Sequence, residues 1–78
     1  MKKYLISKLS DTQRLVSEPV EVNGEKRVEI RKEWRSSRSQ VWMSAKAVTV
    51  PYKDIPAIIE ILAGLISDTV NQKYILEE

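Results

Sequence analysis

The sequence predicts an α+β domain, in which a four-stranded antiparallel β-sheet is followed by one carboxy-terminal α-helix, in the order β-β-β-β-α. Three observations carry this prediction. Apolar and polar residues alternate over much of residues 2–50, which is typical of strands with one buried face. From Pro51 onward the apolar period changes from two to about 3.6, the period of an amphipathic helix. Asn23-Gly24 marks a two-residue hairpin turn, because these residues accept the positive φ that such a turn needs.

Turn signals divide the amino-terminal part of the chain into four expected strands: residues 2–9, 14–22, 26–35 and 40–50. Short connections join them, so an antiparallel meander is the simplest sheet. Pro19 lies inside the second strand and cannot donate a ladder hydrogen bond, so we expect an edge position or a bulge there. In the third strand Val28 and Ile30 point to one face. Glu29 and Arg31 point to the other face, which is therefore charged.

The helix is expected over residues 54–71, with Asp54 as its N-cap and Pro56 in its first turn. It is apolar beyond a single stripe, so it has two surfaces to cover: its own sheet and the helix of a symmetry mate. Residues 73–78 form either a frayed tail or a segment that docks on the partner subunit. The helix residues expected at the dimer interface are Ile58, Ile61, Leu62 and Leu65.

Length and composition limit what the chain can do. Residues 1–78 make one small domain, whose core is marginal without a disulfide, a metal or a partner. The absence of cysteine and histidine excludes disulfides, thiolate metal sites and imidazole catalysis. The sequence holds no glycine-rich phosphate loop and no nucleophile constellation. We therefore expect a homodimer that is not an enzyme and that uses no metal or cofactor.

The sequence also bears on location. It lacks the continuous apolar stretch of a signal peptide and the roughly 20 apolar residues that span a bilayer. We expect a cytoplasmic protein with no membrane partner, nucleoid-associated in a bacterium or nuclear in a eukaryote.

The charges are unevenly placed along the chain. The formal net charge is +2, but residues 26–46 hold seven basic and two acidic residues, a local charge of +5. Residues 47–78 carry a local charge of −3. A basic middle and an acidic end indicate an anionic partner on one surface. Charge alone leaves a second interpretation open, a mosaic of charges that only keeps the protein soluble.

The third strand contains V-E-I-R-K-E-W, and a basic loop, A-K-A-V-T-V-P and an amphipathic helix follow it. This series, roughly residues 22–65, resembles the carboxy-terminal domain of the transcriptional positive cofactor 4 family. The resemblance implies a homodimeric, sequence-tolerant single-stranded DNA binder that acts in transcription, replication or repair and grips strand segments in β-channels. It places Arg31 and Trp34 at the family's arginine and tryptophan. Lys46 matches the basic residue of the fourth strand, and Gly24 matches the turn glycine.

Four positions depart from the family pattern. Val22 stands where an aromatic that stacks on a base is usual, and Ala47 replaces a strand glycine. Asn23 and Glu25 replace turn lysines. These changes should weaken binding or move it toward other residues, for which Trp42 and Lys26 are candidates.

The candidate nucleic-acid-binding residues are Arg31, Trp34, Lys46, Lys26, Arg35 and Arg38. Two of them have alternative roles. Arg31 binds phosphate or pairs across the sheet with Glu18 or Glu21. Trp34 shares the parity of Val28 and Ile30, so it is either a core residue or a stacking platform at the strand end.

The parity of the fourth strand leaves further alternatives. Trp42 shares the parity of Val48 and Val50, which favours a core position unless a bulge intervenes. Lys46 shares this inward parity, so a bulge or a strand end is expected near it. Arg35 and Arg38 flank a serine-rich loop and are expected to be a solvated cluster that assists electrostatically.

The expected function is sequence-tolerant binding of single-stranded DNA through a basic, aromatic-bearing sheet face, in the manner of a transcription coactivator. RNA as a ligand, and transcription or replication proteins as partners, stay open. One alternative is a dimeric double-stranded DNA-binding regulator that inserts a β-ribbon into a groove. The other is a non-catalytic protein-interaction module that uses the helix to dimerise and its charges only for solubility.

Overall fold

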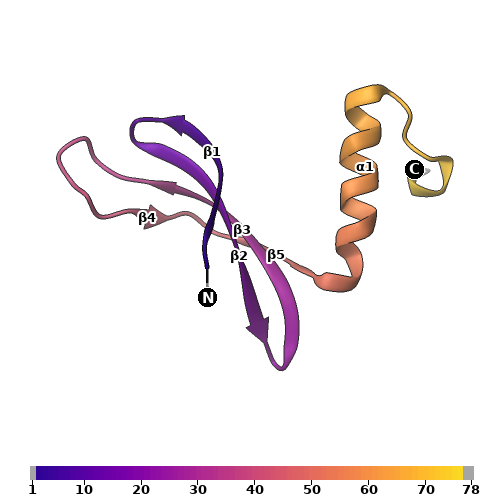
Figure 1. Cartoon of the computed structure of the whole chain (residues 1–78), viewed down its shortest axis with the longest axis horizontal. Coiled ribbons are helices and arrows are strands. Elements are labelled where there is room, and N and C mark those ends of the chain that lie inside the picture. Colours follow the sequence, from indigo (N-terminus) through magenta and orange to yellow (C-terminus); the bar gives the residue numbers. More distant parts are fainter. Residues whose placement is uncertain (1, 77–78) are drawn as a thin grey trace.

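The computed structural model describes residues 2–76 as an antiparallel sheet followed by a helix (Figure 1). Strands β1, β2 and β3 lie in sequence order, and both β4 and β5 pair with β3. The α+β class and the antiparallel sheet are therefore as expected. The elements are β1 (Tyr4–Ser10), β2 (Gln13–Val22), β3 (Glu25–Trp34), β4 (Met43–Ser44), β5 (Val48–Pro51), the 3₁₀ turn η1 (Tyr52–Asp54), α1 (Ile55–Ser67) and the 3₁₀ turn η2 (Gln72–Tyr74).

The expected fourth strand, residues 40–50, is two short strands instead of one. Ser44 of β4 pairs with Glu33, and Val48 of β5 pairs with Ile30. Three residues, 45–47, therefore oppose two residues of β3, which is the count of a β-bulge. The extra residue reverses the alternation of side chains between β4 and β5. Lys46 lies in this irregular segment, so the expected bulge near it is confirmed.

The β2–β3 hairpin is the longest paired segment, and its details follow from the sequence. Asn23 has φ 51° and Gly24 has φ 80°, as the predicted two-residue turn requires. β1 pairs with β2 only up to Ser17, so β2 has no neighbour on this side at Pro19. The expected edge position of Pro19 is thus confirmed, and its missing N–H leaves no gap in the β1 ladder.

The cross-strand register gives the sheet two chemically distinct faces. On one face Arg14 of β2 lies opposite Glu33 of β3, and Val16 lies opposite Arg31. We call this the charged face. The other face, here the apolar face, carries the Val28–Val50 and Ile30–Val48 pairs of β3 and β5. The predicted division between Val28 and Ile30 on one side and Glu29 and Arg31 on the other is confirmed.

The helix is shorter than expected. It begins at Ile55 and ends at Ser67, not at residue 71, because Asp68 adopts a left-handed conformation with φ 57°. The N–H groups of Asp68 and Thr69 then donate to the carbonyl of Gly64, which closes the last turn. Asp54 is at the N-cap, but its side chain makes no capping hydrogen bond; Pro56 lies in the first turn as expected.

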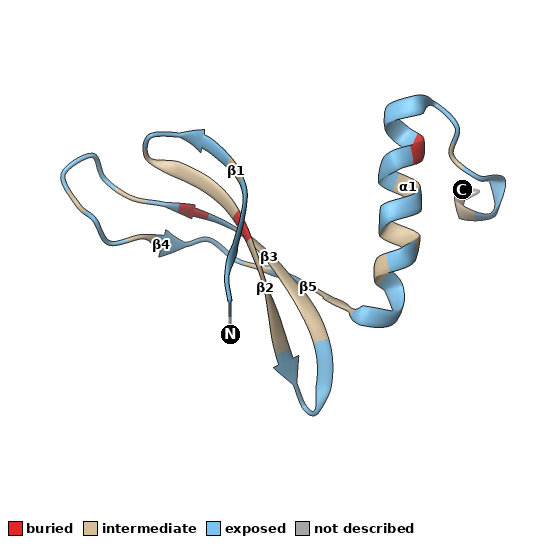
Figure 2. Cartoon of the chain, viewed as in Figure 1, coloured by how far each residue is buried: buried red, intermediate tan, exposed pale blue. Residues whose placement is uncertain are grey.

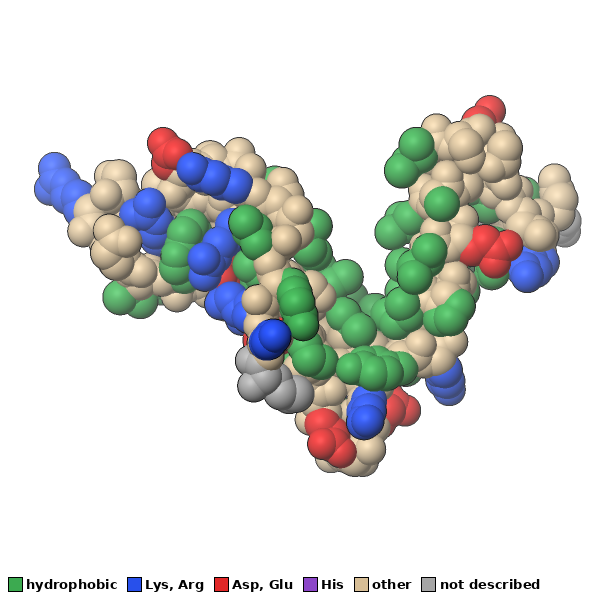
Figure 3. All heavy atoms as spheres, viewed as in Figure 1, with side chains coloured by type: hydrophobic (Ala, Val, Ile, Leu, Met, Phe, Trp, Pro, Cys, Tyr) green, Lys and Arg blue, Asp and Glu red, His purple; other side chains and the backbone are tan. Residues whose placement is uncertain are grey.

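The expectation that α1 covers its own sheet is wrong. In Figures 1 and 3 the helix projects away from the sheet, and apolar side chains border the open space between them. Val16 is the single fully buried apolar side chain among residues 2–76, and buried residues are confined to short stretches of β2, β3 and α1 (Figure 2). The radius of gyration is 15.5 Å, whereas a compact chain of this length has about 11.5 Å.

The opposite side of α1 is covered by the carboxy-terminal segment. This segment turns back through η2, and the hydroxyl of Tyr74 donates to Glu60 at 2.6 Å. That hydrogen bond raises the pKa of Tyr74. Val70 packs against Gly64, where an added Cβ would lie only 3.0 Å from the Val70 Cα. The described part of residues 73–78 therefore folds onto its own helix; residues 77 and 78 lie outside the described range, and Leu76 remains exposed.

Candidate functional site

An ion-pair network occupies the centre of the charged face. Glu33 is only 3% exposed, and its carboxylate accepts hydrogen bonds from Lys3 at 2.8 Å, Arg14 at 2.7 Å and Arg31 at 3.2 Å. Burial by itself raises the pKa of Glu33, but the three cationic donors outweigh burial and hold that pKa at about 2, against an ordinary 4.5. Glu33 is therefore an anion at neutral pH and fixes the three cations around it.

Arg31 is the second centre of this network. Its Nη1 donates to Glu18 at 2.5 Å and to Glu29 at 2.7 Å, and its side chain is only 12% exposed. The hydrogen bond to Glu18, followed by that to Glu29, raises the pKa of Arg31. Of the two expected cross-strand partners, Glu18 is present and Glu21 is not, because Glu21 lies opposite Lys26. Arg31 has three carboxylates around it, so phosphate binding by this residue stays a prediction with little geometric support.

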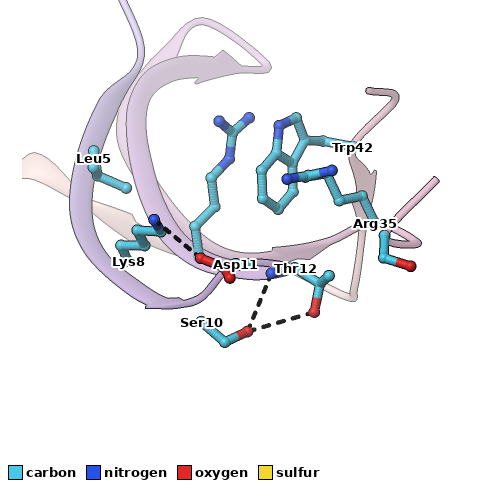
Figure 4. A pocket seen from close by; sticks show the side chains of 9 residues that line it. Leu5, Lys8, Ser10, Asp11, Thr12, Arg35 and Trp42 are labelled. Atoms are coloured by element: carbon cyan, nitrogen blue, oxygen red, sulfur yellow. Dashed lines mark hydrogen bonds and ion pairs between the residues drawn. The ribbon is translucent and has the colours of Figure 1, made fainter. Parts of the chain in front are cut away.

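A hollow of about 510 Å³ opens at the end of the charged face that is far from α1. Figure 4 shows its walls: β1 and the β1–β2 turn on one side, and the β3–β4 loop on the other. Lys8 forms an ion pair with Asp11 at 3.3 Å on its rim. The lining residues are Leu5, Lys8, Ser10, Asp11, Thr12, Arg14, Arg35, Ser37 and Trp42.

Trp42 organises the cations of this hollow. The Arg14 guanidinium carbon lies 4.0 Å from the centre of the Trp42 ring, and that of Arg35 lies 5.2 Å from it. Both distances are within cation–π range. Hydrogen bonds also fix both arginines: Arg14 donates to Glu33, and Arg35 donates to the carbonyl of Ser39 at 2.9 Å. The result is two positioned guanidiniums beside an indole in a solvent-open hollow.

Local sequence features explain this arrangement. Arg35 continues the parity of Glu33, and its backbone N–H donates to the carbonyl of Thr12 at 3.0 Å, which ties the β3–β4 loop to the β1–β2 turn. Trp42 has the parity of Ser44, which faces Glu33. The bulge at residues 45–47 separates this parity from that of Val48 and Val50. Trp42 is therefore not a core residue: the bulge, which the sequence left open as the exception to a core position, does intervene.

The structure does not bring the six predicted binding residues together. Arg35 lines the hollow, and Arg38 is exposed in the adjoining loop. Trp34 is paired with Met43 at the end of the apolar face and is 42% exposed, so it is not a core residue in the single chain. Lys46 is exposed at the bulge. Lys26 lies near the hairpin turn, about 30 Å from Arg35 at the usual rise per strand residue.

Two cationic residues of the hollow, Arg14 and Lys8, are not among the nucleic-acid-binding residues predicted from the sequence. Arg35 is among them, and Trp42 is a candidate to compensate for the lost aromatic at Val22. A signal for Arg14 existed in the sequence. It has the same parity as Val16 and Glu18 in the second strand, so it belongs to the charged face. The contact between Trp42 and Arg14 had no such signal, because it depends on the path of the loop and on the bulge after it.

Comparison of the chain with protein-family models, curated proteins and solved structures finds no match. Within residues 2–76, no helix is both long enough and apolar enough to cross a membrane. The same residues contain no group of three or more acidic, His or Cys side chains arranged to hold a metal ion.

Proposed function

We propose that the chain is a sequence-tolerant single-stranded DNA-binding protein that acts as a homodimer, similar to transcription coactivators of the positive cofactor 4 type. The observation that supports this most is the hollow in which Arg14 and Arg35 flank Trp42 at one end of the charged face. Arginine forks bind phosphate oxygens, and grooves that combine cations with aromatic rings are typical of single-strand binders.

The distribution of free charge favours the same end of the sheet. In Figure 3 several Lys and Arg side chains lie over the end that is far from α1. Arg38 is exposed in the loop that follows Arg35, and Lys8 is exposed on the rim, where it is paired with Asp11. Towards the hairpin turn, by contrast, Glu21 lies opposite Lys26 and Glu25 is paired with Arg27 at 2.8 Å, so the tip carries no net charge. A neutral hairpin tip offers a DNA groove little electrostatic attraction, so the β-ribbon mode of duplex binding is less favoured.

The apolar surface supports the homodimer. The chain exposes 6479 Å², whereas a compact monomer of 9.0 kDa exposes about 4,850 Å². The surplus of about 1,600 Å² lies in the range of roughly 1,000–2,500 Å² that each subunit of an obligate dimer buries. Part of the exposed apolar surface lies on α1, at Ile59, Leu62, Leu65 and Ile66. A second copy of the chain fits this surface, because its own helix presents the same apolar stripe.

Titration of labelled oligonucleotides tests the proposal. Single strands and duplexes of mixed sequence are titrated at two salt concentrations, and the mass of the protein is measured by sedimentation. We expect the dimer to bind single strands of different sequence with similar affinity, and to bind them less tightly at higher salt. Tight, sequence-selective duplex binding would favour the β-ribbon regulator instead. Binding to neither form would leave the protein-interaction module.

A further inference from the structure

We propose that the hollow binds one phosphate group of the nucleic-acid strand between Arg14 and Arg35, and that Trp42 aligns these arginines instead of stacking on a base. This inference rests on the proposed function and assigns a chemical role to each residue of its site. The ligand chemistry is a phosphate oxygen pair, which an internal phosphodiester and a terminal phosphomonoester both supply.

Both arginines have donors left for a ligand. Arg14 uses Nε and Nη2 to contact Oε1 of Glu33, each at 2.7 Å, and its Nη1 has no hydrogen-bond partner among residues 2–76. Arg35 uses Nη1 for the carbonyl of Ser39. Its Nε and Nη2 have no partner within the described part of the chain. Two guanidiniums that are fixed on one edge and free on another form a phosphate-binding pair.

The position of the arginines over Trp42 argues against base stacking on that ring. A base that stacked on the indole would need the ring surface that lies 4.0 Å from Arg14 and 5.2 Å from Arg35. The indole instead restrains two side chains that otherwise sample many rotamers, which lowers the entropy lost on binding. Figure 4 shows the Arg35 side chain running alongside the Trp42 ring.

The acidic side chains at the hollow already have cationic partners. Asp11, which lines the hollow, is ion-paired with Lys8, and Glu33 is paired with Arg14 on the side of Nε and Nη2. Two cations that share one aromatic ring repel each other, and an anion between them removes this repulsion. Ser10, Thr12 and Ser37 also line the hollow, and the hydroxyls of Ser10 and Thr12 are hydrogen-bonded to each other at 3.4 Å.

The experiment compares an ordinary oligothymidine with an abasic sugar-phosphate strand of the same length. Affinities are measured for the wild-type protein, Arg35→Gln and Trp42→Leu, with Lys53→Gln as a control for the loss of an exposed charge on η1. Arg35→Gln should weaken binding by about tenfold or more, because a hydrogen bond to a charged group is lost. It should also make the log–log salt slope shallower by about 0.7. Trp42→Leu should weaken binding to the ordinary and the abasic strand by the same factor.

The melting midpoint of each variant shows whether it is folded; Arg35→Gln removes the hydrogen bond to Ser39 and the contact with the Trp42 ring, both at the surface of the hollow, so it should stay folded. A loss on Trp42→Leu that is confined to the strand with bases would mean stacking and would overturn the inference. The inference would also be overturned if both variants bound single strands with wild-type affinity. The proposed function would still stand in that case. If the wild-type protein binds no single strand, the proposed function itself fails.

The source of the phosphate is decided with strands that differ only at their ends. A circular strand has only phosphodiesters, whereas linear strands with a 5′-phosphate or a 5′-hydroxyl differ in one phosphomonoester. If Arg35→Gln weakens binding to the circular strand as much as to the linear ones, the hollow holds a backbone phosphodiester. If it weakens binding only to the 5′-phosphorylated strand, the hollow holds a strand end.

Discussion

The two faces of the β-sheet differ in how far a single chain satisfies them. On the charged face Glu33 has three cationic partners and Arg31 has three anionic ones, so these charges are compensated within one subunit. On the apolar face Val48 is 63% exposed, and the helix that could cover it stands away, with Leu62 55% exposed. Hydrogen bonds are satisfied by a few well-placed neighbours in adjacent strands. Burying apolar side chains requires a large contact area, and a small domain buries a smaller fraction of its surface than a large one does.

The two faces therefore contribute differently: the apolar face bears on the stability of the fold, and the charged face carries the proposed binding site. A buried ion-pair network contributes little net stability, because the cost of desolvating the charges offsets their attraction. With Val16 as the one buried apolar side chain of the described residues, the driving force for folding must come from the apolar face and α1. We propose that a second copy of the chain supplies it. The hollow at the far end of the charged face is built within one subunit.

The largest effect is expected from a charge on the open stripe of α1. Leu62→Glu should dissociate or unfold the dimer, because it removes the burial of one leucine from each subunit, about 3–6 kcal/mol per dimer, and adds a desolvated carboxylate. Sedimentation and the dependence of the melting midpoint on protein concentration measure this.

Ser67→Glu is the matched control. Ser67 is also exposed, but it lies about 140° around the helix from Leu62, so the dimer should survive this change. A wild-type chain that sediments as a stable folded monomer at micromolar concentration would show that the apolar surface of α1 and the sheet does not need a second copy to cover it.

The next effect concerns the charged face. Glu33→Gln leaves Lys3, Arg14 and Arg31 without their shared anion, and the lowered pKa of Glu33 corresponds to about 3 kcal/mol. We expect a loss of stability of that order, measured by urea denaturation. Glu29→Gln, at the more exposed edge of the network, should cost clearly less. Equal losses in the two variants would mean that Glu33 is not the centre of the network.

Glu33 also makes the free energy of unfolding depend on pH. The pKa of Glu33 is about 2 in the folded protein and 4.5 ordinarily, so the unfolded chain binds more protons between these two pH values. The stabilisation by Glu33 is complete above about pH 4.5 and is lost as the pH falls towards 2. By pH 3 about 2 kcal/mol should be gone. Unfolding of the wild type and of Glu33→Gln at pH 6 and pH 3 isolates this contribution, since the variant lacks it. A difference between the two proteins that does not change with pH would contradict it.

The hairpin shows how much of the fold follows from the sequence. Alternation in the third strand predicts that Val28 and Ile30 share a face, and Asn23-Gly24 predicts the turn, because both features depend only on local backbone geometry. The bulge at residues 45–47 is different. Its local signal is the inward parity of Lys46, which predicts a bulge or a strand end without deciding between them, yet one extra residue moves Trp42 from the apolar face to the charged face.

The helix shows the same limit at a larger scale. Its apolar stripe is evident from the period. Of the four residues predicted at the dimer interface, Leu62 and Leu65 are exposed, whereas Ile58 and Ile61 are half-buried. Which sheet this stripe contacts is not encoded in the period, since its own sheet and a partner both offer apolar surface. The candidate site likewise has one part that the sequence predicts and one part that it does not. Arg35 could be predicted from its charge and its loop, whereas its pairing with Arg14 across Trp42 depends on how two distant segments meet.

The smallest expected effect is on the covered side of α1, the counterpart of its open stripe. Gly64→Ala would place a Cβ 3.0 Å from the Cα and 3.1 Å from the N of Val70. Such overpacking costs typically about 1–3 kcal/mol, while alanine improves the helix by about 1 kcal/mol. We expect a net loss of about 1 kcal/mol in thermal or urea unfolding. In a chain shortened to end at Thr69 the contact is gone, so the same substitution should stabilise. This reversal of sign identifies the packing of the carboxy-terminal segment on α1 as the cause. A stabilising Gly64→Ala in both chains would show that Val70 does not pack there, and that α1 is as open on this side as on its apolar stripe.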